Sequence, residues 1–242
     1  MDIQDYINAQ RANLESISKL PNFYKIGGLT NELYELAVTL VPKSSPIHFG
    51  QLLLICHKSF LSALILIGQA QPDDEGPITR RAIEAARLAL AIKTNPENAR
   101  KWVAYEKRMG RWEARDRDEK PKLLTPKLSL PNSHPILNEL EKQLGILSDS
   151  SVHLTPEFFG SQHWVRSGTK VELRYFMSDQ RKIECNLITL AGVHACILRI
   201  FNECLNGPFF SDDRWFRVWG QLENIGKPLA EAFKPLERLD EV

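Results

Sequence analysis

The sequence predicts a mainly α-helical protein, a bundle of about eight or nine helices with one β-hairpin insertion near residues 157–176. Apolar residues recur at helical spacing along most of the chain. Proline, glycine and capping residues divide this pattern into segments of ordinary helix length. One stretch differs: FFGSQHWV and VELRYF are rich in β-branched and aromatic residues, and RSGTK between them is typical of a turn.

The composition is that of a soluble globular protein. Hydrophobic residues make up 43% of the chain and charged residues 25%, and the formal net charge of +1 does not favour a nucleic-acid or membrane surface driven by bulk charge. The polar N-terminus MDIQDYINAQ lacks the features of a signal peptide. No segment is poor enough in apolar residues to act as a linker, so we expect a single helical domain over residues 1–242.

The compartment and the absence of a membrane span are also predicted from sequence. The longest apolar run, Leu52 to Ile67, is interrupted by His57 and Lys58 and falls short of the roughly 20 apolar residues that cross a bilayer. The four cysteines form no CxxC motif, which favours reduced, buried thiols. We therefore expect a cytoplasmic protein without a disulfide framework.

In the N-terminal half, five helices are expected, and the pair over residues 47–95 should form the core. Its first helix is apolar around most of its circumference, which is typical of a central helix enclosed by others. Gly27-Gly28 predicts a loop, after which Thr30 should cap a helix. The expected helices cover residues 3–18, about 30–41, 47–70, 77–94 and a segment that starts after the cap residue Asn95.

In the C-terminal half, the hairpin separates a short helix from a helical pair over residues 179–235. Ser133 should cap the short helix and Gly145 should end it. Ser178 should cap a long helix over about 179–206, and Ser211 or Asp212 should start the last one.

The candidate ligand-binding residues on the helix over 77–94 are Arg80, Arg81, Glu84 and Arg87, which share about a third of the circumference. Arginines held by a carboxylate can present a planar fork to a phosphate or carboxylate ligand. The alternative is an Arg–Glu ion-pair network on a half-exposed face, which is the commoner role of such residues.

Histidines provide the other candidates. His57 and His194 each lie at the centre of an apolar stripe, where a facing pair could hold a metal or transfer a proton, although a core histidine is the commoner outcome. His153 lies in the serine-rich segment LSDSSVHLTP. The sequence contains none of GxxxxGK[ST], GxGxxG, HExxH, GxSxG or an EF-hand loop, so no metal, cofactor or catalytic residue is assigned.

Two of these segments give the chain a resemblance to uncharacterised bacterial helical-bundle proteins that are distantly HEPN-like. One is the apolar helix followed by Arg81-Ala82-Ile83-Glu84 and the NPE break, and the other is the segment around His153; together they span about 47–156. The resemblance implies a helical bundle, often dimeric, of a toxin–antitoxin or phage-defence type. It also implies that Arg81, Glu84 and His153 converge. The Arg-His spacing of HEPN RNases is absent from this sequence.

Three functions are consistent with these features. The first is a cytoplasmic binding or interaction protein, acting as a homo-oligomer, most simply a dimer, with a protein partner as a further option. The second is an enzyme, HEPN-like or other, that uses Arg81, Glu84 and His153. The third is an RNA-binding, antitoxin-like module in which arginines contact phosphates, so that binding should weaken steeply with salt. These arginines are Arg80, Arg81, Arg87, Arg108, Arg111, Arg115 and Arg117.

Overall fold

The protein is mainly helical, as the sequence predicts. The computed structural model describes residues 2–102, 134–147, 164–167, 170–173, 175–177 and 179–232. Within these residues the α-helices include α1 (Ile3–Ser18), α2 (Pro21–Leu40), α3 (Ile47–Gly68), α4 (Gly76–Thr94), α6 (Pro135–Leu147), α8 (Gln180–Cys204) and α9 (Asp213–Ala232). Residues 97–102 are also helical. The short 3-10 helices η1 (Pro72–Glu75) and η4 (Phe209–Ser211) precede α4 and α9.

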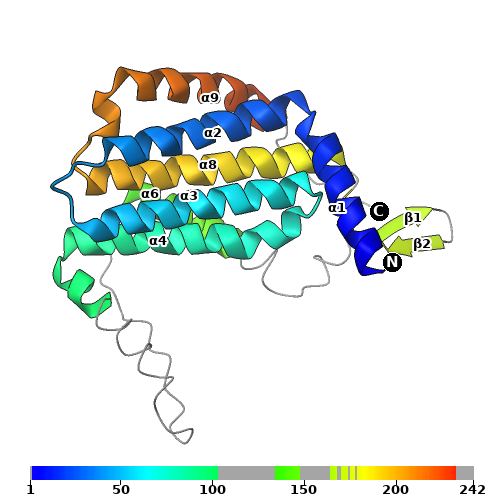
Figure 1. Cartoon of the computed structure of the whole chain (residues 1–242), viewed down its shortest axis with the longest axis horizontal. Helices are drawn as coiled ribbons and strands as arrows, with labels where there is room; N and C mark the ends of the chain where they lie inside the picture. The colour runs from blue at the N-terminus through cyan, green and yellow to red at the C-terminus, as the bar shows by residue number, and fades with distance from the viewer. Residues whose placement is uncertain are drawn as a thin grey trace, which may run out of the picture.

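The long helices run side by side as a bundle, and α1 crosses one end of it (Figure 1). α3 and α4 pack closely along their length, joined by the tight turn that contains η1. α8 packs against five of the described α-helices, α2, α3, α4, α6 and α9, whereas α2 and α3 each pack closely against four. The predicted core pair is thus a closely packed pair, but α8 occupies the centre.

Several helix boundaries follow from capping residues. Asp2 caps α1 in a reciprocal capping box with Asp5. Asp179 caps α8 through its side chain, which accepts hydrogen bonds from the backbone N–H groups of Arg181 and Lys182. The predicted cap of this helix, Ser178, lies outside the described residues, as does Ser133. The predicted stop at Gly145 is wrong, because α6 runs through to Leu147.

The predicted loop at Gly27-Gly28 is also wrong, because α2 begins at Pro21 and passes through both glycines. The hydroxyl of Thr30 donates to the carbonyl of Ile26 at 2.8 Å inside the helix and does not cap it. A Cβ atom at Gly27 would lie 3.0 Å from Cδ2 of Leu64 on α3. Gly27 therefore serves the close approach of α2 to α3, a use of glycine that looks the same in sequence as a loop signal.

Two short strands, β1 (Trp164–Ser167) and β2 (Lys170–Leu173), pair antiparallel with Trp164 opposite Leu173. They fall within the range 157–176, part of which lies outside the described residues. Just after them, the backbone N–H of Met177 donates to the carbonyl of Ala70 at 2.8 Å, and Phe176 stacks on Tyr6 of α1. These contacts fix residues 175–177 against α1 and the end of α3.

Among the described residues, α3 and α8 are each long and apolar enough to cross a membrane, judged by length and composition alone. Their surroundings differ. α8 is enclosed by five helices, whereas α3 leaves Ile47, Leu54, Leu61 and Ile65 exposed. The expectation that α3 is enclosed on all sides is therefore wrong.

Candidate functional site

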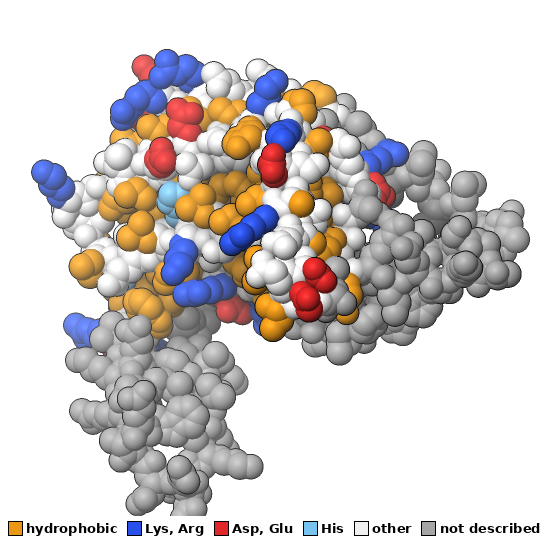
Figure 2. Space-filling view, turned by 45° about the vertical axis from the view of Figure 1, so that its right-hand side comes forward, with side chains coloured by type: hydrophobic (Ala, Val, Ile, Leu, Met, Phe, Trp, Pro, Cys, Tyr) orange, Lys and Arg blue, Asp and Glu red, His pale blue; other side chains and the backbone are white. Residues whose placement is uncertain are grey.

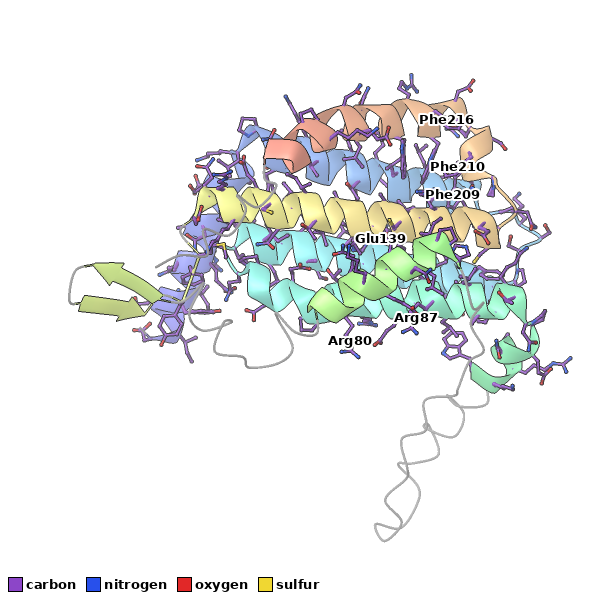
Figure 3. All side chains as sticks on the ribbon, turned by 180° about the vertical axis from the view of Figure 1, so that it is seen from behind. Arg80, Arg87, Glu139, Phe209, Phe210 and Phe216 are labelled. Atoms are coloured by element: carbon purple, nitrogen blue, oxygen red, sulfur yellow. The ribbon has the colours of Figure 1, made fainter. Side chains whose placement is uncertain are left out.

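The charged residues of α4 point to two different sides of the helix. Nε of Arg80 lies 3.0 Å from Oε1 of Glu84, an ion pair one helical turn apart. Nη2 of Arg87 lies 3.3 Å from Oε1 of Glu141 on α6. Figure 3 shows Arg80 and Arg87 on the side of α4 that α6 crosses. Both pairs are partly exposed, so they resemble the ion-pair network that was the alternative to a ligand site.

Arg81 lies instead on the side of α4 that adjoins α3. It lines a shallow pocket of about 200 Å³, together with Lys58, Ser59 and Ser62 of α3. The described lining of this pocket contains two cationic side chains and no carboxylate. Arg81 therefore also borders the exposed edge of α3.

His153 lies outside the described residues, so its predicted convergence with Arg81 and Glu84 stays a prediction. Arg81 and Glu84 have different neighbours: Arg81 adjoins Lys58, and Glu84 pairs with Arg80.

A second cluster, buried between α2, α3 and α8, joins the two histidines singled out in the sequence. The hydroxyl of Tyr34 lies 2.6 Å from Nδ1 of His194, and the rings of Tyr34 and His57 stack in parallel at 4.9 Å. Phe60 packs edge-on against His194 at 5.2 Å. His57 and His194 thus meet through Tyr34, and the described residues contain no group of three side chains that could hold a metal.

Burial determines the charge state of this cluster. Desolvation, with a smaller contribution from His57, lowers the pKa of His194 to about 3, and burial also lowers the pKa of His57. Burial raises the pKa of Tyr34 well above its usual range. Nε2 of His194 is buried with no partner among the described residues. The neutral cluster is therefore part of the core, which was the commoner expectation for these histidines.

Tyr34 was missed in the sequence, although a signal for it exists. It lies three residues before Ala37 and next to Leu33, both on the buried face of α2. A tyrosine on a buried helix face needs a partner for its hydroxyl, and the central histidine of an apolar stripe is the obvious one.

The most distinctive surface feature is the exposed face of α3. Its exposed side chains are Ile47, Gln51, Leu54, Lys58, Leu61 and Ile65, a set that we call the α3 stripe. They recur at alternating spacings of four and three residues, so they form one line along the helix. Figure 2 shows hydrophobic side chains spread over the middle of the visible face, with Lys, Arg, Asp and Glu side chains between them.

The two edges of the α3 stripe carry opposite charge. On the α2 side, Nε2 of His57 lies 2.8 Å from Oδ1 of Asn31, whose amide group donates to Oε1 of Glu35 at 2.8 Å. On the α4 side lies the pocket with Lys58 and Arg81. The acidic edge and the basic edge thus flank one apolar line.

The chain was compared with models of known protein families, with curated proteins and with solved structures, and none of the three comparisons gave a match.

Proposed function

We propose that this protein is a cytoplasmic helical interaction protein that acts as a homodimer, with the α3 stripe as the contact between the two copies. The observation that carries the proposal is the exposure of four large hydrophobic side chains, Ile47, Leu54, Leu61 and Ile65, along one line of one helix. Contiguous exposed apolar surface of this kind marks interaction sites in soluble proteins.

The spacing of the α3 stripe favours another helix as the occupant. Alternation of four and three residues is the pattern of a coiled-coil seam, in which side chains of one helix fill the gaps of its partner. The two polar members, Gln51 and Lys58, suit this role. A polar seam residue fixes the register of the two helices, and a lysine covers apolar surface with its stem while its ammonium reaches water.

The charged edges favour a second copy of this chain. In a dimer whose twofold axis runs along α3, the two α3 helices are parallel, and the α2 edge of one copy faces the α4 edge of the other. The acidic edge with Glu35 then lies along the partner's basic edge with Lys58 and Arg81. An axis across α3 would instead bring like-charged edges together, so charge complementarity supports the parallel arrangement.

Dimerisation also accounts for the apolar character of α3 without a membrane. Among the described helices, α3 and α8 pass the length and composition criteria for a span, but α8 is enclosed in the bundle and the exposed line of α3 includes Gln51 and Lys58. A dimeric helical bundle agrees with the distant HEPN-like resemblance, so we retain a toxin–antitoxin or phage-defence role as part of the proposal.

We also retain the β-hairpin insertion, supported by the pairing of β1 with β2.

Sedimentation velocity of the purified protein over a range of concentrations tests the proposal. The wild type should sediment at twice the chain mass of 27.7 kDa, and Leu54→Glu should sediment as a monomer with an unchanged circular dichroism spectrum. The matched control is Phe216→Glu on α9, because Phe216 has the same exposure of 54% as Leu54. A wild type that stays monomeric and binds lipid vesicles would overturn the homodimer in favour of a membrane surface.

A further inference from the structure

A second cavity lies at the opposite end of the bundle from α1, beside Ile47, where the α3 stripe begins. Its volume is about 420 Å³, within the usual range of small-molecule sites. It is lined by residues of the α2–α3 connection and the first turn of α3, of the end of α4 and the residues just after it, and of the end of α8. Three stretches of the chain that meet at this end of the bundle (Figure 1) therefore build one concave site.

The walls of this pocket are largely apolar. Phe49 of α3, Ile92 of α4 and Leu205 after α8 line it, with prolines and Cys204 beside them. Burial raises the pKa of the Cys204 thiol to about 12, so this group is a neutral part of the wall. Such a surface suits the hydrocarbon part of a ligand and does not suit a small hydrated ion.

The polar groups of the pocket favour an anion. Lys93 is the one charged side chain in the described lining, and its ammonium donates to Oδ1 of Asn206, which holds it at the pocket. Nε2 of His48 is buried and has no partner among the described residues. His48 lines this pocket, and an unpaired buried nitrogen of this kind is a group that a ligand or an ordered water molecule can satisfy.

The backbone at the start of α3 also favours an anion in this pocket. α3 begins at this pocket, and its first turn receives no hydrogen bond from a capping side chain. The unpaired N–H groups of a helix N-terminus carry partial positive charge and favour a negative group nearby. Burial lowers the pKa of His48, so its ring is neutral near pH 7 and can donate a hydrogen bond from Nε2.

We propose that this pocket binds a small organic carboxylate with an apolar body, its carboxylate between Lys93 and His48 and its hydrocarbon against Phe49, Ile92 and Leu205. The inference is independent of the homodimer, because none of these side chains belongs to the α3 stripe. The neutral imidazole and the single ammonium match the single charge of a monocarboxylate. The apolar walls favour such a carboxylate over inorganic anions, which have no hydrocarbon part to bury.

Isothermal titration calorimetry with the full chain tests this inference, using hydrocinnamate and octanoate as probes and hydrocinnamamide as the neutral counterpart. At least one carboxylate should bind with a dissociation constant below about 1 mM, and the amide should bind more weakly. Lys93→Met should weaken carboxylate binding about tenfold, the effect of losing one charge-assisted contact, and should leave amide binding unchanged.

Two further variants keep the test specific. Lys142→Met removes an exposed lysine of α6 and should leave carboxylate binding unchanged. Ser45→Trp fills the pocket from the α2–α3 connection and should abolish binding of both probes. Failure of both carboxylates to bind, equal affinity for the amide, or carboxylate binding that survives Lys93→Met or Ser45→Trp would each overturn the inference.

Discussion

The hydroxyl of Tyr34 on α2 and Nδ1 of His194 on α8 lie 2.6 Å apart inside the core. The same two helices share a second, partly buried polar contact, in which the amide group of Asn22 donates to Oε1 of Glu184 at 3.3 Å. Both residues are fully buried, and Nε2 of His194 has no partner among the described residues. One hydrogen bond thus satisfies the hydroxyl and one of the two ring nitrogens, and its loss would leave a buried polar atom unpaired.

Tyr34→Phe should lower the free energy of unfolding by about 1–3 kcal/mol, because it leaves Nδ1 of His194 buried without a partner. Urea denaturation followed by circular dichroism measures this change. Tyr24→Phe is the control: Tyr24 is 68% exposed on the same helix, and its variant should unfold as the wild type does. Equal stability of Tyr34→Phe and Tyr24→Phe would show that the buried hydrogen bond adds nothing.

His194 should make the fold sensitive to acid. Its pKa is about 3 in the folded protein against 6.5 as a free side chain, so between these values the unfolded chain binds one more proton at this residue. Stability from this group is complete above pH 6.5 and falls as the pH drops toward 3, with a slope of up to about 1.4 kcal/mol per pH unit.

The measurement is urea denaturation at several pH values between about 5 and 7, above the range in which ordinary carboxylates titrate. His194→Gln keeps a hydrogen-bond acceptor for Tyr34 but cannot titrate, so it should lose most of the pH dependence in this window. If His194→Gln shows the same pH dependence as the wild type, the proton responsible binds elsewhere, with His57 the nearest alternative.

Glycines at two helix positions should respond in opposite ways to alanine. At Gly192 of α8 a Cβ atom would meet nothing within 4 Å, so Gly192→Ala should stabilise the fold by about 0.5–1 kcal/mol. At Gly68 the same atom would lie 2.6 Å from Cδ1 of Leu14 and 3.0 Å from Cζ of Phe23. Gly68→Ala should therefore show no gain or a loss in thermal unfolding temperature. A gain equal to that of Gly192→Ala would mean that α1 and α2 can shift freely.

The sequence predicted the fold class and most helices well, because amphipathic spacing and local caps determine them. The starts of α3 and α4 lie within a residue of the predictions. The predicted caps were less accurate, because Thr30 lies inside α2 and Asp179 caps α8. Gly27 was misread because the contact that explains it is with Leu64, which is distant in sequence.

The candidate site was harder to predict, because it too depends on contacts between residues that are distant in sequence. Helical spacing placed Arg80, Glu84 and Arg87 on one face, but it could not show that Glu141 of α6 would pair with Arg87. An apolar circumference indicates that α3 has little polar surface, and it does not reveal how many neighbours the helix has. Which part of α3 stays exposed depends on the packing of all the other helices.

The most direct test of the homodimer is a double-mutant cycle on its charged edges, measured by sedimentation equilibrium. Glu35→Lys and Arg81→Glu should each weaken the dimer by placing like charges opposite each other, and the double variant should restore much of the wild-type affinity because the two charges are exchanged. A wild type that sediments as a 27.7 kDa monomer at high concentration, or a double variant as weak as both single changes together, would contradict self-association through α3.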